Sequence, residues 1–394
     1  MRPAPIAMTQ TAQLQSERQA LRRLDIAAFL MDTGLGTVSL ALPLWGLHLA
    51  ASSSQLGLLG SAMRLPNMLL ALTFGRLSDT LGRKVPAITS CLLLFIIYAI
   101  TPMASSVMTL ALFAALIGAS VALFWPSMQA WVGDLRPSSG SLGVSTSSFN
   151  AAWSAGSMMG NLLAGALFQV HMGLPFWSSS LLVLLIAVFL FRTPTTAPVR
   201  PQEDAAAVNA AHPDHDSFLR AAWIGNFSAY CTFGIIMNLF PELGHAEFNL
   251  SPFAIGCLIM LLGLARTITF WYMGRWIAWP YQTRFMFRSL PAAALGLLLI
   301  AFAPTPWLLV PGFVILGSVM GFSFNSSLLY SLSSPENVGA KTGRHETMAV
   351  GGIMTGSLLG GILAETFGLR TPYLVAALFV SLVSLRQRQL LKGL

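Results

Sequence analysis

Three ionisable side chains lie inside long apolar stretches of this sequence. Asp32 lies six residues into the first stretch, Arg64 eight residues into the second, and Arg266 well inside a later one. In a bilayer such a group costs about 2.5–3.5 kcal/mol, and at 1.5 Å per residue each arginine lies roughly 12 Å from the nearer end of its stretch. Two positive groups beside one carboxylate favour binding of an anionic group. Alternatively, Asp32 neutralises Arg64 across adjacent helices and Arg266 bonds to backbone carbonyl groups.

Aromatic and amide side chains occur at a similar depth. They are Trp125, Gln129, Asn150, Trp153, Phe324 and Asn325. Buried amides need hydrogen-bond partners or water, so the asparagines indicate a wet cavity between helices. The aromatic residues would serve equally well as packing between helices, with no ligand.

Enzymatic chemistry is not indicated. The apolar stretches contain no HExxH motif, cysteine pair or Ser/His/Asp set, and Cys91, Cys231 and Cys257 lie far apart. The adjacent His345 and Glu346 are interpreted as polar residues at a helix end. We therefore expect no metal, no cofactor and no catalytic residue.

The composition predicts an all-α integral membrane protein. Only 9% of the 394 residues are charged and 55% are hydrophobic, which leaves too little polar surface for a water-soluble globule. A bilayer-spanning helix needs roughly 20 apolar residues. Twelve stretches qualify: 26–49, 56–74, 85–103, 107–131, 142–168, 174–191, 219–241, 252–273, 285–303, 307–333, 346–367 and 371–385.

The basic residues predict the orientation of the helices. With a cytoplasmic amino terminus, 19 of the 22 Lys and Arg residues fall in or beside cytoplasmic segments, as the positive-inside rule requires. The net charge of +8 then needs no nucleic acid as a partner. The expected divisions are a cytoplasmic amino-terminal tail over 1–25, a six-helix bundle over 26–191, a cytoplasmic linker over 192–218, a second six-helix bundle over 219–388 and a cytoplasmic carboxyl-terminal tail over 389–394.

The two bundles are copies of one another. Residue matches recur at an offset that drifts only from 198 to 200. They pair Gly36 with Gly234, Pro43 with Pro241, Gly57 with Gly256, Gly75-Arg76 with Gly274-Arg275, Gly118 with Gly317, and GSMMGNLLA from Gly156 with GSLLGGILA from Gly356. Six helices in each copy give a parallel repeat, in which a substrate site lies near the midplane between the halves. Asp32, Arg64 and Arg266 break the repeat, which makes them candidates for function.

A charged ten-residue turn, GRLSDTLGRK over 75–84, separates the second and third apolar stretches. Its Gly75, Asp79, Gly82, Arg83 and Lys84 resemble the signature loop of the major facilitator superfamily of secondary transporters. The resemblance to the bacterial efflux-like branch of this family implies twelve transmembrane helices in two six-helix pseudo-repeats. It also implies alternating access and a multi-pass protein of the bacterial inner membrane.

The resemblance assigns mechanical roles. Asp79 would face the start of helix 11, and Arg83 would reach an acidic residue at the end of helix 4, here Asp134. Helices 5 and 11 would cross helices 8 and 2 of the opposite half at the seams that open and close. The glycine pairs Gly156 with Gly160 and Gly356 with Gly360 are candidates for these seams, and static packing is the alternative.

The expected function is therefore secondary transport of small organic solutes, coupled to protons through Asp32, with export slightly favoured. The substrate-binding candidates are Asp32, Arg64, Trp125, Gln129, Asn150, Trp153, Arg266 and Asn325. A monomer in the lipid bilayer is expected. The alternatives are uptake or exchange of an organic anion through the two arginines and, more remotely, a non-transporting membrane receptor or scaffold.

Overall fold

The computed structural model describes residues 5–134, 142–193, 212–276, 278–334 and 338–392. Twelve long α-helices make up almost all of this described part, which confirms the predicted all-α fold. They are α1 (Pro5–His48), α2 (Ser53–Leu81), α3 (Lys84–Ile100), α4 (Val107–Asp134), α5 (Leu142–Val170), α6 (Leu174–Phe191), α7 (His215–Phe248), α8 (Pro252–Arg275), α9 (Thr283–Ala301), α10 (Leu309–Leu332), α11 (Val338–Phe367) and α12 (Thr371–Leu390).

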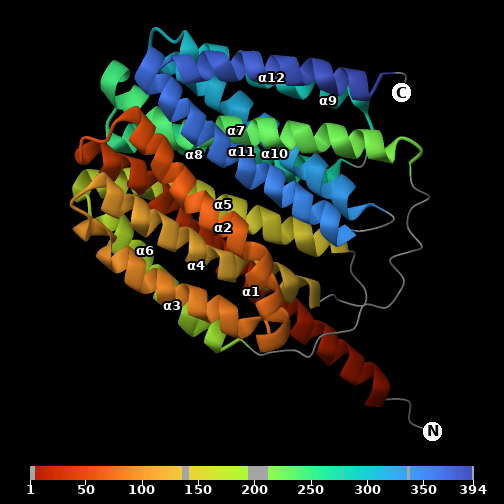
Figure 1. Cartoon of the computed structure of the whole chain (residues 1–394). Coiled ribbons are helices and arrows are strands. Elements are labelled where there is room, and N and C mark those ends of the chain that lie inside the picture. Colours follow the sequence, from red (N-terminus) through yellow and green to blue (C-terminus); the bar gives the residue numbers. More distant parts are fainter. Residues whose placement is uncertain (1–4, 135–141, 194–211, 277, 335–337, 393–394) are drawn as a thin grey trace.

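The first six helices form one half of the molecule and the last six form the other (Figure 1). In the first half α1 packs on α5, α2 on α4 and α3 on α6; in the second half α7 packs on α11, α8 on α10 and α9 on α12. The two patterns are the same after a shift of six helices, as the sequence repeat predicts. Between the halves, α5 packs on α8 and α2 on α11.

The two ends of the bundle are distinguished by the turns that lie there. The end with the turn between α2 and α3 is called the Gly82 end, and the end with the turn between α1 and α2 is called the Ser52 end. The first and last described residues both lie at the Gly82 end, on the right of Figure 1. Helix α1 already begins at Pro5, so a helix runs through most of the segment that was expected to be a tail.

Eight helices in the described part of the chain are long and apolar enough to cross a membrane by composition alone. The other four are α2, α5, α7 and α12. Of these, α2, α5 and α7 contact helices of the opposite half. Where these helices contact the opposite half, their side chains face protein and cavity instead of lipid, and this environment tolerates polar residues.

The turn within the charged segment 75–84 is shorter than expected. Helix α2 continues through Gly75 to Leu81, and only Gly82 and Arg83 connect it to α3. Gly82 ends the helix with φ 79°, a left-handed value that glycine adopts without steric cost. The prediction of a ten-residue turn was wrong because the polar residues of this segment lie on a helix that extends beyond its apolar part.

The paired glycines lie inside each half. A Cβ at Gly156 would meet the carbonyl oxygen of Phe29 on α1, and a Cβ at Gly356 would meet that of Cys231 on α7. Gly160 and Gly360 likewise face α1 and α7. The assignment of these four glycines to the seams was wrong, and the packing alternative holds. The sequence spacing shows that two glycines share a helix face, but not which neighbour that face contacts.

The seams use other glycines, which lie close to the Ser52 end. Gly57 on α2 and Gly361 on α11 contact each other's helix, and Gly165 on α5 packs against Pro252 at the start of α8. Small residues let helix backbones approach closely in a bilayer. The halves are therefore tightly joined at the Ser52 end.

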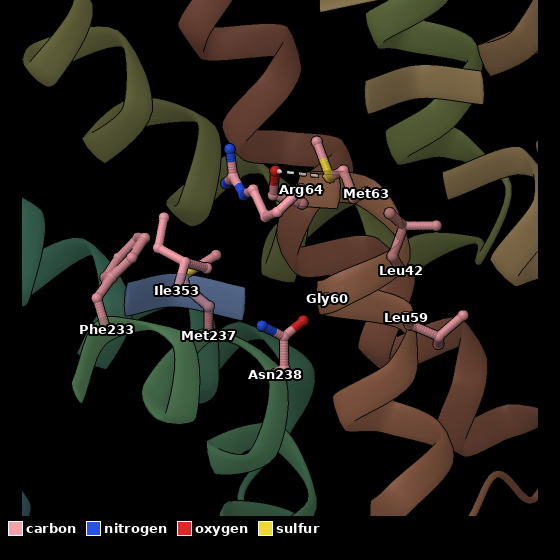
Figure 2. Close-up of a pocket in the computed structure, with 10 residues that line it drawn as sticks. Leu42, Leu59, Gly60, Met63, Arg64, Phe233, Met237, Asn238 and Ile353 are labelled. Carbon is pink, nitrogen blue, oxygen red and sulfur yellow. Dashed lines mark hydrogen bonds between the residues drawn. The ribbon is translucent and has the colours of Figure 1, made fainter. Parts of the chain in front are cut away.

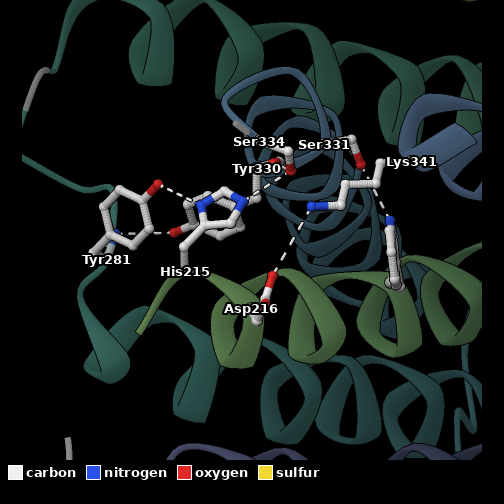
Figure 3. A network of polar contacts seen from close by, with 8 residues as sticks. His215, Asp216, Tyr281, Tyr330, Ser331, Ser334 and Lys341 are labelled. Carbon is white, nitrogen blue, oxygen red and sulfur yellow. Dashed lines mark hydrogen bonds and ion pairs between the residues drawn. The ribbon is translucent and has the colours of Figure 1, made fainter. Parts of the chain in front are cut away.

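At the Gly82 end, His215 forms hydrogen bonds that connect separate segments of the second half (Figure 3). Ser334 Oγ donates to the Tyr330 carbonyl at 3.0 Å, so Nε2 of His215 donates to Ser334 Oγ at 2.9 Å and Nδ1 accepts from the Tyr281 hydroxyl at 2.9 Å. Burial, and then the positive charge of Lys341, lower the pKa of His215 below its ordinary value. A neutral His215 thus joins the start of α7 to the α8–α9 connection and the end of α10.

The close approach at Gly118 yields a first prediction. A Cβ there would overlap the carbonyl oxygen of Met63 on α2, so Gly118→Ala should destabilise the first half by about 1–3 kcal/mol through overpacking. Thermal unfolding in mild detergent measures the effect as a lower midpoint. Gly274→Ala is the matched control, since a Cβ at Gly274 meets nothing within 4 Å. Equal midpoints for the two variants would contradict this packing.

Candidate functional site

The three ionisable residues singled out above lie near the middle of the bundle, between the halves. Asp32 on α1 is 8% exposed and Arg266 on α8 is 3% exposed, while Arg64 on α2 is half-buried. Both arginines act electrostatically on Asp32. Among the described residues, however, no ion pair within 4.0 Å joins them to it. The carboxylate is therefore held between two positive charges without a direct partner.

Arg266 reaches across from the second half to the first. Its Nε donates to Ser154 Oγ on α5 at 3.1 Å, and its guanidinium lies over the Trp153 ring at 5.1 Å from the centroid. Ser154 in turn shares a 2.8 Å hydrogen bond with Thr267 on α8. A cation over an indole face is favourable, and more so away from water. Within the described part of the chain, Arg266 thus contacts side chains of the opposite half and not the backbone carbonyl groups of the alternative interpretation.

Trp153 and Phe324 belong to an aromatic cluster between the halves. The Trp153 ring lies 5.6 Å from that of Phe324 and 6.1 Å from that of Phe270, and Tyr230 lies 5.8 Å from Phe324. Trp153 Nε1 donates to Asn150 Oδ1 at 3.0 Å, which fixes the indole. These rings form an apolar wall beside the Arg266 charge.

Arg64 borders a small cavity between α1, α2, α7 and α11 (Figure 2). The cavity has a volume of about 20 Å³, which is room for one water molecule. Asn238 of the second half lies across it, donating to Gly234 O at 3.0 Å and Ser357 Oγ at 2.9 Å. The Arg64 guanidinium makes no hydrogen bond among the described residues. A positive group with unused donors therefore faces the space between the halves.

Glu346 is a site residue that the sequence reasoning missed. The sequence analysis interpreted Glu346 and His345 together as polar residues at a helix end. In the structure, His345 is fully buried against Phe324. Glu346 is exposed between the halves, and the side chain of the exposed Gln129 on α4 lies close enough to favour its charged form. Only the rotational position of α11 places this carboxylate toward α4, and no motif signals it.

Glu346 changes the charge balance of the site. Asp32, Glu346, Arg64 and Arg266 all act electrostatically on Tyr230. Two carboxylates and two guanidinium groups sum to zero formal charge, so the excess positive charge expected from the sequence is absent from this set of described residues.

The remaining candidates lie around this centre. Trp125 packs on Phe149, 6.1 Å between ring centroids, inside the first half. Asn325 is half-buried on α10, next to Phe324. Solvent thus reaches polar side chains of both halves on the Gly82 side of the buried charges, whereas the Ser52 side is closed by the glycine seams.

The charged turn at the Gly82 end holds α2 to α4. Arg83 Nε lies 2.9 Å from Asp134 Oδ2, and Arg83 Nη1 donates to Ser78 Oγ at 3.1 Å. Lys84 Nζ donates to the Thr193 carbonyl at 2.9 Å, beyond the end of α6. The Asp79 side chain lies outside the described residues, so its predicted contact with helix 11 stays a prediction, as does the gating role of Gly75.

Comparison with known proteins agrees with this architecture. The family model of the Major Facilitator Superfamily matches residues 24–330 and 222–386. The multidrug resistance protein MdtG of Proteus mirabilis is 32% identical over 167 residues, 40% of this chain and 41% of that protein. The PmrA multi-drug efflux pump homolog of Lactococcus lactis is 29% identical over 168 residues, 41% of each. The chain thus spans about two fifths of the length of these curated relatives.

Solved structures show the same fold at low identity. The nucleoside transporter NupG has a TM-score of 0.73 at 14% identity, covering 95% of this chain and 100% of that one. A bacterial homolog of human Spinster in an inward-facing, occupied conformation has a TM-score of 0.74 at 14% identity, covering 96% and 97%. With its signature residues, its two matching six-helix halves and the family model that spans both, this chain belongs to the Major Facilitator Superfamily.

Proposed function

We propose that this protein exports small organic molecules in exchange for protons, with Asp32 carrying the proton. The observation that carries the proposal is the position of Asp32, which is 8% exposed, between the halves, and without an ion-pair partner among the described residues. Burial disfavours its charged form and Arg64 with Arg266 favours it. A solute that changes the distance or solvation of either arginine therefore changes the free energy of protonating Asp32.

Export is supported by the relatives and by the orientation. The relatives that the chain matches are named as multidrug resistance and efflux proteins. The positive-inside rule assigns the Gly82 end to the cytoplasm, since the basic residues cluster there in sequence. The described conformation then faces inward, with Gln129 and Glu346 accessible from the cytoplasm.

The aromatic cluster and the balanced charges suit a range of solutes. Rings such as Trp153 and Phe270 offer planar apolar surface, while the zero net charge of the four ionisable groups selects neither cations nor anions strongly. A site with this chemistry accepts neutral or zwitterionic molecules that carry an aromatic or aliphatic body. A cationic solute then binds near the two carboxylates, and an anionic solute binds near the two arginines.

A test of the proton role uses purified protein in liposomes with an imposed pH gradient. Candidate solutes that trigger proton flux through the wild type should trigger none through Asp32→Asn, because the amide cannot exchange a proton. Asp25→Asn is the control: Asp25 accepts a 2.6 Å hydrogen bond from Ser148 within the first half and should retain flux. Proton flux that persists in Asp32→Asn would contradict the assignment.

A second candidate function is uptake or exchange of an organic anion. The unused donors of Arg64 favour it, since an anionic group would satisfy them. Under this function, Arg64→Gln should raise the half-saturation concentration of an anionic solute about tenfold or more, because the variant loses one charge-assisted hydrogen bond to the solute. Unchanged half-saturation in Arg64→Gln and Arg266→Gln, measured by radiolabelled uptake, would remove the anion site.

The ion pair between Arg83 and Asp134 lies within the first half and should fix the Gly82 end of α2, the helix that also packs on α11 of the opposite half. Its two side chains are 21% and 25% exposed, so the pair is partly screened, and such pairs contribute no more than about 1 kcal/mol. Breaking it with Asp134→Asn should shift the conformational equilibrium and lower the turnover rate several-fold. The exchanged pair Arg83→Asp with Asp134→Arg should restore part of the rate. A double variant no better than the single one would argue that the residues act separately.

A further inference from the structure

A group of exposed basic side chains lies at the Gly82 end of α9 and α12, two helices that pack on each other at the edge of the molecule (Figure 1). Arg284 and Arg288 lie on the first two turns of α9, Arg388 lies in the last turn of α12, and Lys392 follows that turn. The Arg388 guanidinium lies over the ring of Phe287 on α9, 5.8 Å from its centroid. The four basic residues are called the α9–α12 basic surface.

The α9–α12 basic surface has no acidic partner. The sequence contains no Asp or Glu from 248 to 335 or after Glu365, so neither helix carries a carboxylate. Among the described residues, no ion pair includes any of the four basic side chains. Arg284 and Arg288 are four residues apart on α9, a spacing at which like charges on a helix repel each other. The protein itself therefore leaves these positive charges uncompensated.

The first half shows that this charge is not a general property of the fold. At the repeat offset of 200, the counterparts of Arg288 and Arg388 are the apolar Ile88 and Val188. The basic residue that begins α3, Lys84, is satisfied within the protein, because its Nζ donates to a backbone carbonyl group beyond the end of α6 at 2.9 Å. The positive-inside rule accounts for basic residues at one end of a membrane protein, but not for an excess on one of two matching helix pairs.

Apolar side chains continue from the basic surface along the same two helices. Leu295, two helical turns beyond Arg288 and on the same face of α9, is 53% exposed, and Leu382 on α12 is 56% exposed. Trp271 and Tyr272, in the last turns of α8, are also more than half exposed, and such residues are typical of the membrane–water interface. Positive charge at the level of the headgroups thus adjoins an apolar surface at the level of the acyl chains.

We propose that the α9–α12 basic surface binds the headgroup of an anionic phospholipid in the leaflet at the Gly82 end. Guanidinium groups bind phosphate oxygens through paired N–H donors, and basic pockets beside membrane helices hold anionic headgroups. The acyl chains lie along the exposed leucines of α9 and α12. The inference needs a membrane-embedded protein, and it depends neither on the direction of transport nor on the role of Asp32.

The test is native mass spectrometry of the purified full chain, titrated in mild detergent with one lipid at a time. The probes are dioleoyl phosphatidylglycerol and dioleoyl phosphatidylcholine, which have the same acyl chains but differ in net charge. The wild type should bind its first phosphatidylglycerol about tenfold or more tightly than its first phosphatidylcholine, because only the former has a net negative charge to compensate the arginines.

Two double variants separate the site from the overall charge. Arg288→Gln with Arg388→Gln should weaken phosphatidylglycerol binding about tenfold and leave phosphatidylcholine binding unchanged. Arg192→Gln with Arg220→Gln is the matched control, since it removes the same charge from two exposed residues at the same end, outside α9 and α12; it should bind like the wild type. All substituted side chains are exposed, so both variants should keep the wild-type unfolding midpoint in lipid-free detergent.

Three results would overturn the lipid site. The first is a wild type that binds both lipids equally tightly, and the second is an equal loss of phosphatidylglycerol binding in the two double variants, which would show a general effect of net charge. The third is displacement of the bound lipid by millimolar inorganic phosphate, which would show a site for a free anion. Phosphatidylglycerol that stays bound in phosphate supports the lipid site.

Discussion

The cost of placing charge in the interior of a membrane protein is the constraint on which this structure depends. Asp32, Arg64 and Arg266 are kept between the halves, away from lipid, with Glu346 completing a neutral set. Because none of the described groups forms a tight pair with Asp32, its charge remains sensitive to whatever enters the site. Tight pairing would stabilise the site but remove that sensitivity.

This constraint explains where polar residues and glycines lie at the contacts between the two halves. Of the four helices that are not apolar enough to count as membrane spans by composition, α2, α5 and α7 contact the opposite half. Glycines bring these inner helices into backbone contact at the Ser52 end. Polar contacts replace glycines at the site itself, where Arg266 and Ser154 join α8 to α5. Rigid halves joined by small-residue seams can rock about a fixed site.

The global architecture could be predicted from the sequence because it follows from apolar length and from the repeat. Helix number and the parallel duplication depend on patterns that recur over tens of residues, whereas the Arg83–Asp134 contact was implied by the resemblance of segment 75–84 to the family signature. The partners of individual residues could not. The spacing of Gly156 and Gly160 defines a shared helix face, but the identity of the facing helix depends on the rotation of α5 in the bundle. Glu346 was missed for the same reason, since its direction on α11 has no local signal.

Helix ends were also difficult to predict. The residues 75–81 are polar enough to suggest a turn, yet they continue α2 because hydrogen bonding along a helix extends past its apolar part until Gly82 stops it. The serine-rich start of α2 was not recognised as a contact site either. Its partners Glu242 and Glu365 lie 189 and 311 or more residues away in sequence, and only the folded structure brings them together.

Side-specific thiol labelling tests the central claim, alternating access to one site, most directly. A single cysteine at Gln129→Cys, in a background without native cysteines, is treated with a membrane-impermeant reagent in inverted and in right-side-out vesicles. Alternating access predicts labelling from the cytoplasmic face, protection from the outer face, and slower cytoplasmic labelling under conditions that open the Ser52 end. Equal labelling from both faces would show a continuous pore and would contradict the claim, as would cytoplasmic labelling that stays equally fast when the Ser52 end is open.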